Sequence, residues 1–171
     1  MKRVFNLLVV DESGSMSIIE RQALVGINET LTTIQKMQKA HKNMEQRVTL
    51  ITFDSTHKNL FYDNVSAHHI KPLKSRDYNP CGGTPLYDAI GMGIAKINAL
   101  TTEDDSVLVT IITDGEESIA QNMGIDNHLQ FSEDEAGTKA MFARENRARE
   151  RYNKCRAMDC KMEAGSYFGE K

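Results

Sequence analysis

Cysteine is scarce in this chain, and it lacks CxxC pairs, long hydrophobic runs and any excess of basic charge. The 171 residues include three cysteines, Cys81, Cys155 and Cys160. An odd count without paired spacing argues against a zinc site or a disulfide framework and favours reduced thiols in a cytoplasmic protein. The apolar run at residues 4–10 is interrupted by Asp11, so it is too short for a signal peptide or a membrane span.

The charge balance gives no indication of nucleic-acid binding. The formal net charge is −3, so no overall positive field is expected. The stretch RENRARER, residues 144–151, mixes arginine with glutamate, which is typical of a solvated helix face. With 40% hydrophobic and 26% charged residues, the composition fits one soluble globular domain covering residues 1–171.

Apolar runs alternate with segments of helical periodicity. Strands are predicted at residues 4–10, 47–54, 59–65 and 107–113, and helices at 17–42, 85–100 and 135–159. Thr84 would be the N-cap of the second helix, with Pro85 at its first position. The short polar link STHK predicts that strand 59–65 runs antiparallel to strand 47–54. The pattern predicts an α/β fold in three layers, with a mostly parallel, Rossmann-like sheet and one antiparallel edge strand.

Polar residues follow several of these elements where a doubly wound sheet forms its ligand sites, at the carboxyl ends of the strands. The residues in question are Asp11, Ser13 and Ser15 after the first strand, Thr84 before the second helix, and Asp114 after the last long strand. If the first and last long strands are neighbours, two carboxylates and three hydroxyls converge there, without His or Cys. Asp54 ends the second long strand near the same edge and is a candidate acceptor behind the ligands.

An all-oxygen set of this kind suits a hard cation. Mg²⁺ prefers six oxygens and usually retains waters, so a few protein ligands suffice; Mn²⁺ and Ca²⁺ are alternatives. Neutral hydroxyls leave much of the metal's charge uncompensated. We therefore expect the metal to capture a further anionic oxygen, the Asp or Glu carboxylate of a partner protein.

The stretches DESGSM, GGTPLYDAI and ITDGEE resemble the three parts of the metal-ion-dependent adhesion site of von Willebrand factor A domains. The match is to the DxSxS signature, the lone downstream Thr and the downstream Asp, in that order. The resemblance implies that Ser13, Ser15 and Thr84 bind the metal directly, while Asp11 and Asp114 act largely through water or as close acceptors. It also implies that the domain binds a protein partner and is not an enzyme.

A Mg²⁺-dependent phosphatase or phosphotransferase that uses Asp11 as nucleophile is the alternative. Enzymes with the haloacid-dehalogenase pattern would have a second Asp at position 13 and a downstream Lys, whereas this chain has Ser13. The GxSxG elbow of serine hydrolases and the phosphate-binding P-loop are both absent.

The resemblance covers residues 1–117, the core, and breaks in the shortened part 118–171, which ends in a helix. Family members normally continue with another helix and strand, and here such a unit looks missing near Ser118. Without that unit, strand 107–113 would expose an apolar edge. We expect self-association through this edge, unless residues 128–131 cover part of it.

Overall fold

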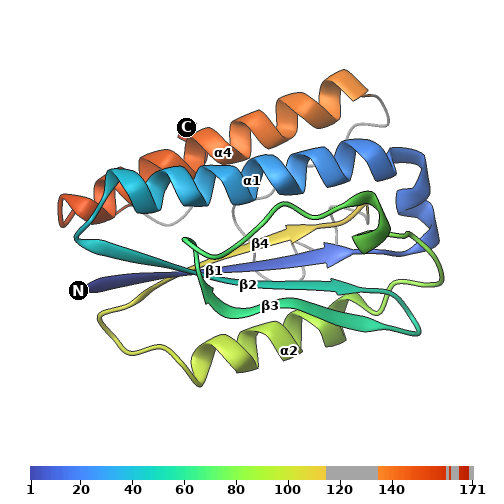
Figure 1. Ribbon diagram of the computed structural model, residues 1–171, viewed down its shortest axis with the longest axis horizontal. Helices are drawn as coiled ribbons and strands as arrows, with labels where there is room; N and C mark the ends of the chain where they lie inside the picture. The colour runs from blue at the N-terminus through green and yellow to red at the C-terminus, as the bar shows by residue number, and fades with distance from the viewer. Residues whose placement is uncertain (115–134, 161, 163–165, 170–171) are drawn as a thin grey trace.

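The structure is a computed structural model that describes residues 1–114, 135–160, 162 and 166–169 (Figure 1). In this part of the chain, four strands form one sheet in the order β3-β2-β1-β4. The strands are β1 (Lys2–Asp11), β2 (Met44–Phe53), β3 (Lys58–Ser66) and β4 (Ser106–Ile112). β1 pairs in parallel with β2 and β4, and β2 pairs antiparallel with β3. The predicted fold class and the antiparallel edge strand are confirmed.

Helices cover both faces of the sheet and complete the three layers. α1 (Glu20–Ala40) and α4 (Glu135–Ala157) lie side by side on one face, and α2 (Leu86–Asn98) lies on the other (Figure 1). Two short 3₁₀ helices, η1 (Gly14–Ile19) and η2 (Ser75–Asp77), occupy connecting loops. The predicted first helix therefore begins with a 3₁₀ segment, and its regular α-helical part starts at Glu20.

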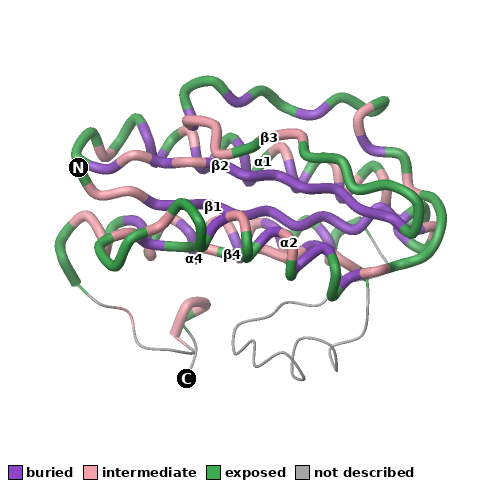
Figure 2. Tube along the Cα trace, turned by 90° about the horizontal axis from the view of Figure 1, so that it is seen from below, coloured by how far each residue is buried: buried purple, intermediate pink, exposed green. Residues whose placement is uncertain are grey.

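The core has one part on each face of the sheet, as the alternating side chains of β1 require. Leu8 and Val10 pack against α1 and α4, whereas Leu7 and Val9 pack against α2. Burial is continuous along β1 from Val4 and along β2 from Val48, and it falls off at β3 (Figure 2). A strand buried on both faces is what the almost unbroken apolar run at residues 4–10 predicts, and Asn6, its one polar residue, is buried as well.

The prediction that residues 144–151 form a solvated face is wrong. Arg149 is fully buried, and Glu145 is only 8% exposed. The Arg149 guanidinium donates to Glu145 Oε1 over 2.7 Å and to Asn6 Oδ1 over 2.6 Å, and it also contacts the Thr110 hydroxyl. α4 is therefore held on β1 and β4 by a buried polar network, since these two strands present Asn6 and Thr110 to it.

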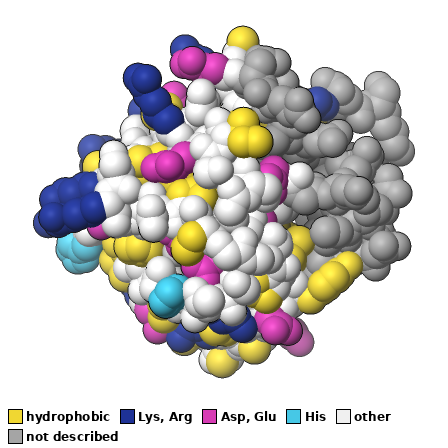
Figure 3. All heavy atoms as spheres, turned by 90° about the vertical axis from the view of Figure 1, so that its right-hand side faces the viewer, with side chains coloured by type: hydrophobic (Ala, Val, Ile, Leu, Met, Phe, Trp, Pro, Cys, Tyr) yellow, Lys and Arg dark blue, Asp and Glu magenta, His cyan; other side chains and the backbone are white. Residues whose placement is uncertain are grey.

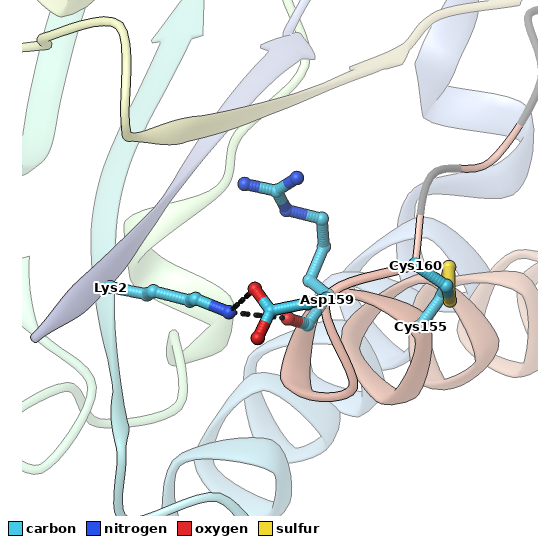
Figure 4. Close-up of a disulfide and its surroundings, with 5 residues drawn as sticks. Lys2, Cys155, Asp159 and Cys160 are labelled. Carbon is cyan, nitrogen blue, oxygen red and sulfur yellow. Dashed lines mark hydrogen bonds and ion pairs between the residues drawn. A yellow bond between two sulfur atoms is a disulfide. The ribbon is translucent and has the colours of Figure 1, made fainter.

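The expectation that all three cysteines are reduced is also contradicted. Cys155 and Cys160 form a disulfide at the end of α4, with their Cα atoms 5.0 Å apart (Figure 4). The chain turns back after Ala157, helped by Asp159, whose φ is +59°. The Asp159 carboxylate accepts a hydrogen bond from Lys2 at the start of β1 (Figure 4). The five-residue spacing suits this turn, a pairing that a search for CxxC motifs misses.

Two expectations fall on residues that the structure does not describe. The missing helix–strand unit near Ser118 and the cover by residues 128–131 both lie within 115–134. Across the described residues, no helix combines the length and apolar character that a membrane crossing demands.

We predict opposite effects for two glycine-to-alanine substitutions. A Cβ at Gly26 in α1 would lie 2.0 Å from the buried Phe142 ring of α4, whereas a Cβ at Gly91 in α2 meets nothing within 4 Å. Gly26→Ala should therefore lower the free energy of unfolding by about 1–3 kcal/mol through overpacking. Gly91→Ala should raise it by about 0.5–1 kcal/mol, as expected for an exposed helix position. Urea unfolding measures both, and a stabilised Gly26→Ala would contradict the close approach of α1 and α4.

The buried ion pair gives a second prediction. Arg149→Met should destabilise the protein by about 3–5 kcal/mol, because it leaves the Glu145 carboxylate buried without its counterion. The double variant with Glu145→Leu should recover much of this loss, since it removes the charge that was left unpaired. Urea unfolding of the single and double variants tests this, and equal losses in both would show that the charge is not the cause.

Candidate metal centre

Asp11 is the last residue of β1, and its side chain is fully buried. Its carboxylate oxygens each accept a hydrogen bond, Oδ1 from the Ser13 backbone N–H over 2.7 Å and Oδ2 from the Thr113 hydroxyl over 2.7 Å. A buried carboxylate needs such donors, because an unpaired charge in the interior is costly. Asp11 therefore fixes both the loop after β1 and the residues that follow β4.

Two serine hydroxyls extend this cluster toward the surface. Ser13 Oγ lies 3.2 Å from Ser15 Oγ, and Ser15 Oγ donates to Asp114 Oδ1 over 3.0 Å. The structure thus brings Asp11, Ser13, Ser15 and Asp114 together, because β1 and β4 are parallel neighbours whose carboxyl ends meet. Their role as metal ligands stays a prediction.

Thr84 is brought to the same edge by its loop. The Gly14 N–H donates to the Gly82 carbonyl over 3.0 Å, and the Cys81 N–H donates to the Glu12 carbonyl over 2.7 Å. Gly82 has a φ of +72°, a conformation that favours glycine. Among the described residues, no hydrogen bond joins the exposed Thr84 side chain to the four other site residues.

The prediction that Thr84 caps the second helix is wrong. α2 begins at Leu86, its N-cap is Pro85, and no side chain caps it by a hydrogen bond. Pro85 has a ψ of 58°, which is not helical, so the helix starts one residue later than predicted. The Thr84 hydroxyl is therefore not used for capping and stays at the exposed end of the loop.

The donor atoms of this cluster are oxygens from hydroxyls and carboxylates, which is the chemistry that a hard cation prefers. Only two of its five residues are acidic. Over the part of the chain that is described, no three His, Cys, Asp or Glu side chains gather as a metal-binding group. The residues fit a magnesium site that depends on hydroxyls and outside ligands, and they do not fit a carboxylate-rich or sulfur-containing one.

Sequence reasoning missed two residues that hold Asp11 in place. Thr113 donates to its carboxylate, and the fully buried Tyr78 donates its hydroxyl to the Asp11 carbonyl over 2.8 Å. Burial, together with the nearby carboxylates, raises the pKa of Tyr78, so its phenol stays protonated. Thr113 directly precedes a predicted ligand, which is a usable signal, whereas Tyr78 lies in an irregular segment that gave none.

Asp54 supports the neighbouring loop and is 4% exposed. Hydrogen bonds from the Thr56 hydroxyl and from the backbone N–H groups of Thr56 and His57 hold the pKa of its carboxyl well below the usual range. The Cys81 thiol also donates to Asp54, over 3.3 Å, and the Ser55 hydroxyl accepts the Gly83 N–H over 2.9 Å. Asp54 thus reaches the loop of Thr84 through Cys81, as an acceptor behind the cluster.

Beside the cluster, the surface is hollowed. The hollow has a volume of about 430 Å³, and its lining includes Glu12, Asp54, Asp77 and Arg76. Figure 3 looks onto this end of the molecule, where acidic and hydrophobic side chains both reach the surface. A partner docked at the cluster would therefore meet both charged and apolar groups.

The low pKa of Asp54 predicts a specific pH dependence of stability. The pKa of the Asp54 carboxyl is lower in the folded protein than the unfolded value of about 3.9. Its contribution to the free energy of unfolding is therefore present above that pH and is lost as the pH falls below it. At neutral pH, the urea concentration at the unfolding midpoint should be higher for wild type than for Asp54→Asn. The difference between the two midpoints should become smaller at acidic pH. The exposed Asp104→Asn is the control, and an unchanged gap for Asp54→Asn would contradict the interpretation.

No family model and no curated protein matches this chain. Among solved structures, the vWF domain of the type V pili tip protein Mfa5 from Porphyromonas gingivalis is similar, with a TM-score of 0.51 and 18% identity over 66% of this chain. A structure of three N-terminal domains of Mfa5 gives a TM-score of 0.49 and 18% identity over 62% of this chain. The chain spans only 38% and 19% of these two structures, respectively. The mixed sheet and its helices therefore have a von Willebrand factor A-like fold.

Proposed function

We propose that this chain is a metal-dependent protein-binding module that captures an acidic residue of a partner. In this proposal Ser13, Ser15 and Thr84 bind Mg²⁺ directly, and Asp11 and Asp114 act largely through water. The observation that carries the proposal is the run of contacts from Asp11 through Ser13 and Ser15 to Asp114 at the carboxyl ends of β1 and β4. The fold likeness to the vWF domain of Mfa5 supports it, because the resemblance of the motif and the likeness of the fold point to the same kind of domain.

The chemistry of the cluster explains why a partner carboxylate is the expected ligand. When bound, Mg²⁺ supplies a concentrated positive charge for an anionic oxygen. Asp11 is buried and already accepts two hydrogen bonds, so it has little freedom to reach outward. The exposed side chains of Ser15, Thr84 and Asp114 face the surface from which a partner would approach.

The same geometry argues against phosphate transfer by Asp11. A nucleophilic carboxylate needs an oxygen that can reach the substrate, whereas Asp11 is fully buried and both of its oxygens accept hydrogen bonds. Ser13 stands where the phosphatase pattern requires an acid or base, and its hydroxyl contacts Ser15. These contacts support a binding role for the cluster.

Replacing Thr84 tests the metal site most cleanly, because its exposed side chain supports no other contact of the cluster among the residues that the structure describes. Calorimetric titration of Mg²⁺ and Mn²⁺ into metal-free wild type should show saturable binding. Thr84→Val should weaken this binding by about tenfold or more, since it removes one oxygen ligand at nearly constant shape. Thr84→Ser keeps the hydroxyl and should bind almost as wild type does.

Addition of acetate tests the carboxylate part of the proposal. If a carboxylate completes the site, acetate should raise the apparent Mg²⁺ affinity of wild type above that in chloride of equal ionic strength, as linkage requires. Absence of metal binding by folded wild type, or equal binding by Thr84→Val, would refute the metal site. Metal binding without an acetate effect would retain the site and refute the capture of carboxylates.

A further inference from the structure

The two edges of the sheet are protected from pairing to very different degrees. β3 carries Lys58 and Asp63, its register with β2 is irregular, and Asn64 has a left-handed φ of 54°. Charges and irregularities of this kind are what keep natural edge strands from pairing with other chains. β4 has the sequence SVLVTII, without charge or proline, and it pairs with β1 in unbroken register. Within the described residues, β1 is its one neighbour.

Alternate residues of β4 point to the two faces of the sheet. Thr110 contacts Arg149 of α4 and Ile112 packs with the α1 side of the core, so the even-numbered residues face α1 and α4. The odd-numbered residues face the side of α2. Ile111 packs there against the α2 part of the core, but Val107 and Val109 are each 40% exposed.

One flank of α2 continues this exposed surface. Lys96 Nζ lies 3.0 Å from the Asp63 carboxylate, which places the Lys96 side of the helix toward β3. At about 100° per residue, Tyr87 and Ile94 lie on the opposite flank, toward β4. They are 57% and 40% exposed, respectively. We call Tyr87, Ile94, Val107 and Val109 the β4 patch.

We propose that the β4 patch is the surface through which two copies of this chain associate. Antiparallel pairing of β4 with β4 about a twofold axis at Val109 would place Val107 opposite Ile111, so that apolar side chains meet on the α2 side. The four side chains of the patch are uncharged, so burying them between two copies desolvates no charged group. The α2 flanks then cover Val107 and Val109.

The β4 patch and the proposed metal site share no residue. The β4 patch runs along the side of the sheet, whereas the Asp11 cluster lies at the ends of the strands. Antiparallel pairing turns the two sheets in opposite directions, so the dimer presents its two clusters at opposite ends. It would therefore bind two partners at once.

Sedimentation velocity over a wide concentration range tests the proposal. Wild type should dimerise, and Val109→Lys should weaken dimerisation by about tenfold or more, because a lysine would be buried without a counterion. Tyr87→Lys should also weaken dimerisation, and because Tyr87 lies on α2, it tests the patch without changing the strand, even if Val109→Lys disturbs folding. Val25→Lys is the matched control, because Val25 is 50% exposed on α1, outside the patch, and this variant should dimerise as wild type does.

Amide hydrogen exchange identifies what covers β4. In wild type, protection of the outward amides of β4 should increase with protein concentration, and in Val109→Lys it should not. A wild type that stays monomeric at every concentration overturns the proposal. It is equally overturned if β4 is as well protected in dilute monomer, which would mean that the chain covers its own edge, or if both lysine variants dimerise like wild type.

Discussion

The position of β1 between two parallel neighbours is the constraint on which the rest of this structure depends. β1 is paired with β2 up to Asp11 and with β4 up to Val10. Its final residue, Asp11, therefore lies in the interior with a charged side chain. Burying that charge is tolerable only with hydrogen-bond donors around it. The Ser13 backbone and the Thr113 hydroxyl supply them, and both come from the loops that form the cluster. The same contacts that satisfy Asp11 therefore assemble the proposed site.

A second polar network joins α4 to the sheet. Asn6 of β1 accepts from Arg149 and donates to Gln46 of β2, which in turn donates to Asn153 of α4. Buried ion pairs add little net stability, because desolvation offsets their attraction. Arg149 and Asn153 both take part in this network, so α4 is joined to β1 and β2 at two positions along its length. Phe142 against Gly26 adds the apolar contact that brings α1 and α4 close together.

How much the sequence predicts depends on whether a residue's partners lie nearby in the chain. The strands and the antiparallel hairpin follow from local patterns, and so does the convergence of Asp11, Ser13, Ser15 and Asp114 once β1 and β4 are neighbours. The buried Arg149 does not, because its partners Asn6 and Thr110 are far away in sequence and the helix pattern shows only mixed charge. The predicted start of α2 is wrong by one residue, because the non-helical ψ of Pro85 depends on the loop in which it lies. The Cys155–Cys160 pair depends on a turn after Ala157 that no pattern indicated.

The direction of the strands separates the two surfaces for which we propose functions. Hydrogen bonding between strands runs across the sheet, so an unprotected edge such as β4 can extend it only sideways. The loops that carry Ser15, Thr84 and Asp114 lie at the strand ends, at right angles to that direction. The two surfaces therefore share no side chain. β4 is nevertheless connected to the cluster over a short distance in the chain, because Thr113, whose hydroxyl donates to Asp11, follows its last residue and Asp114 comes next.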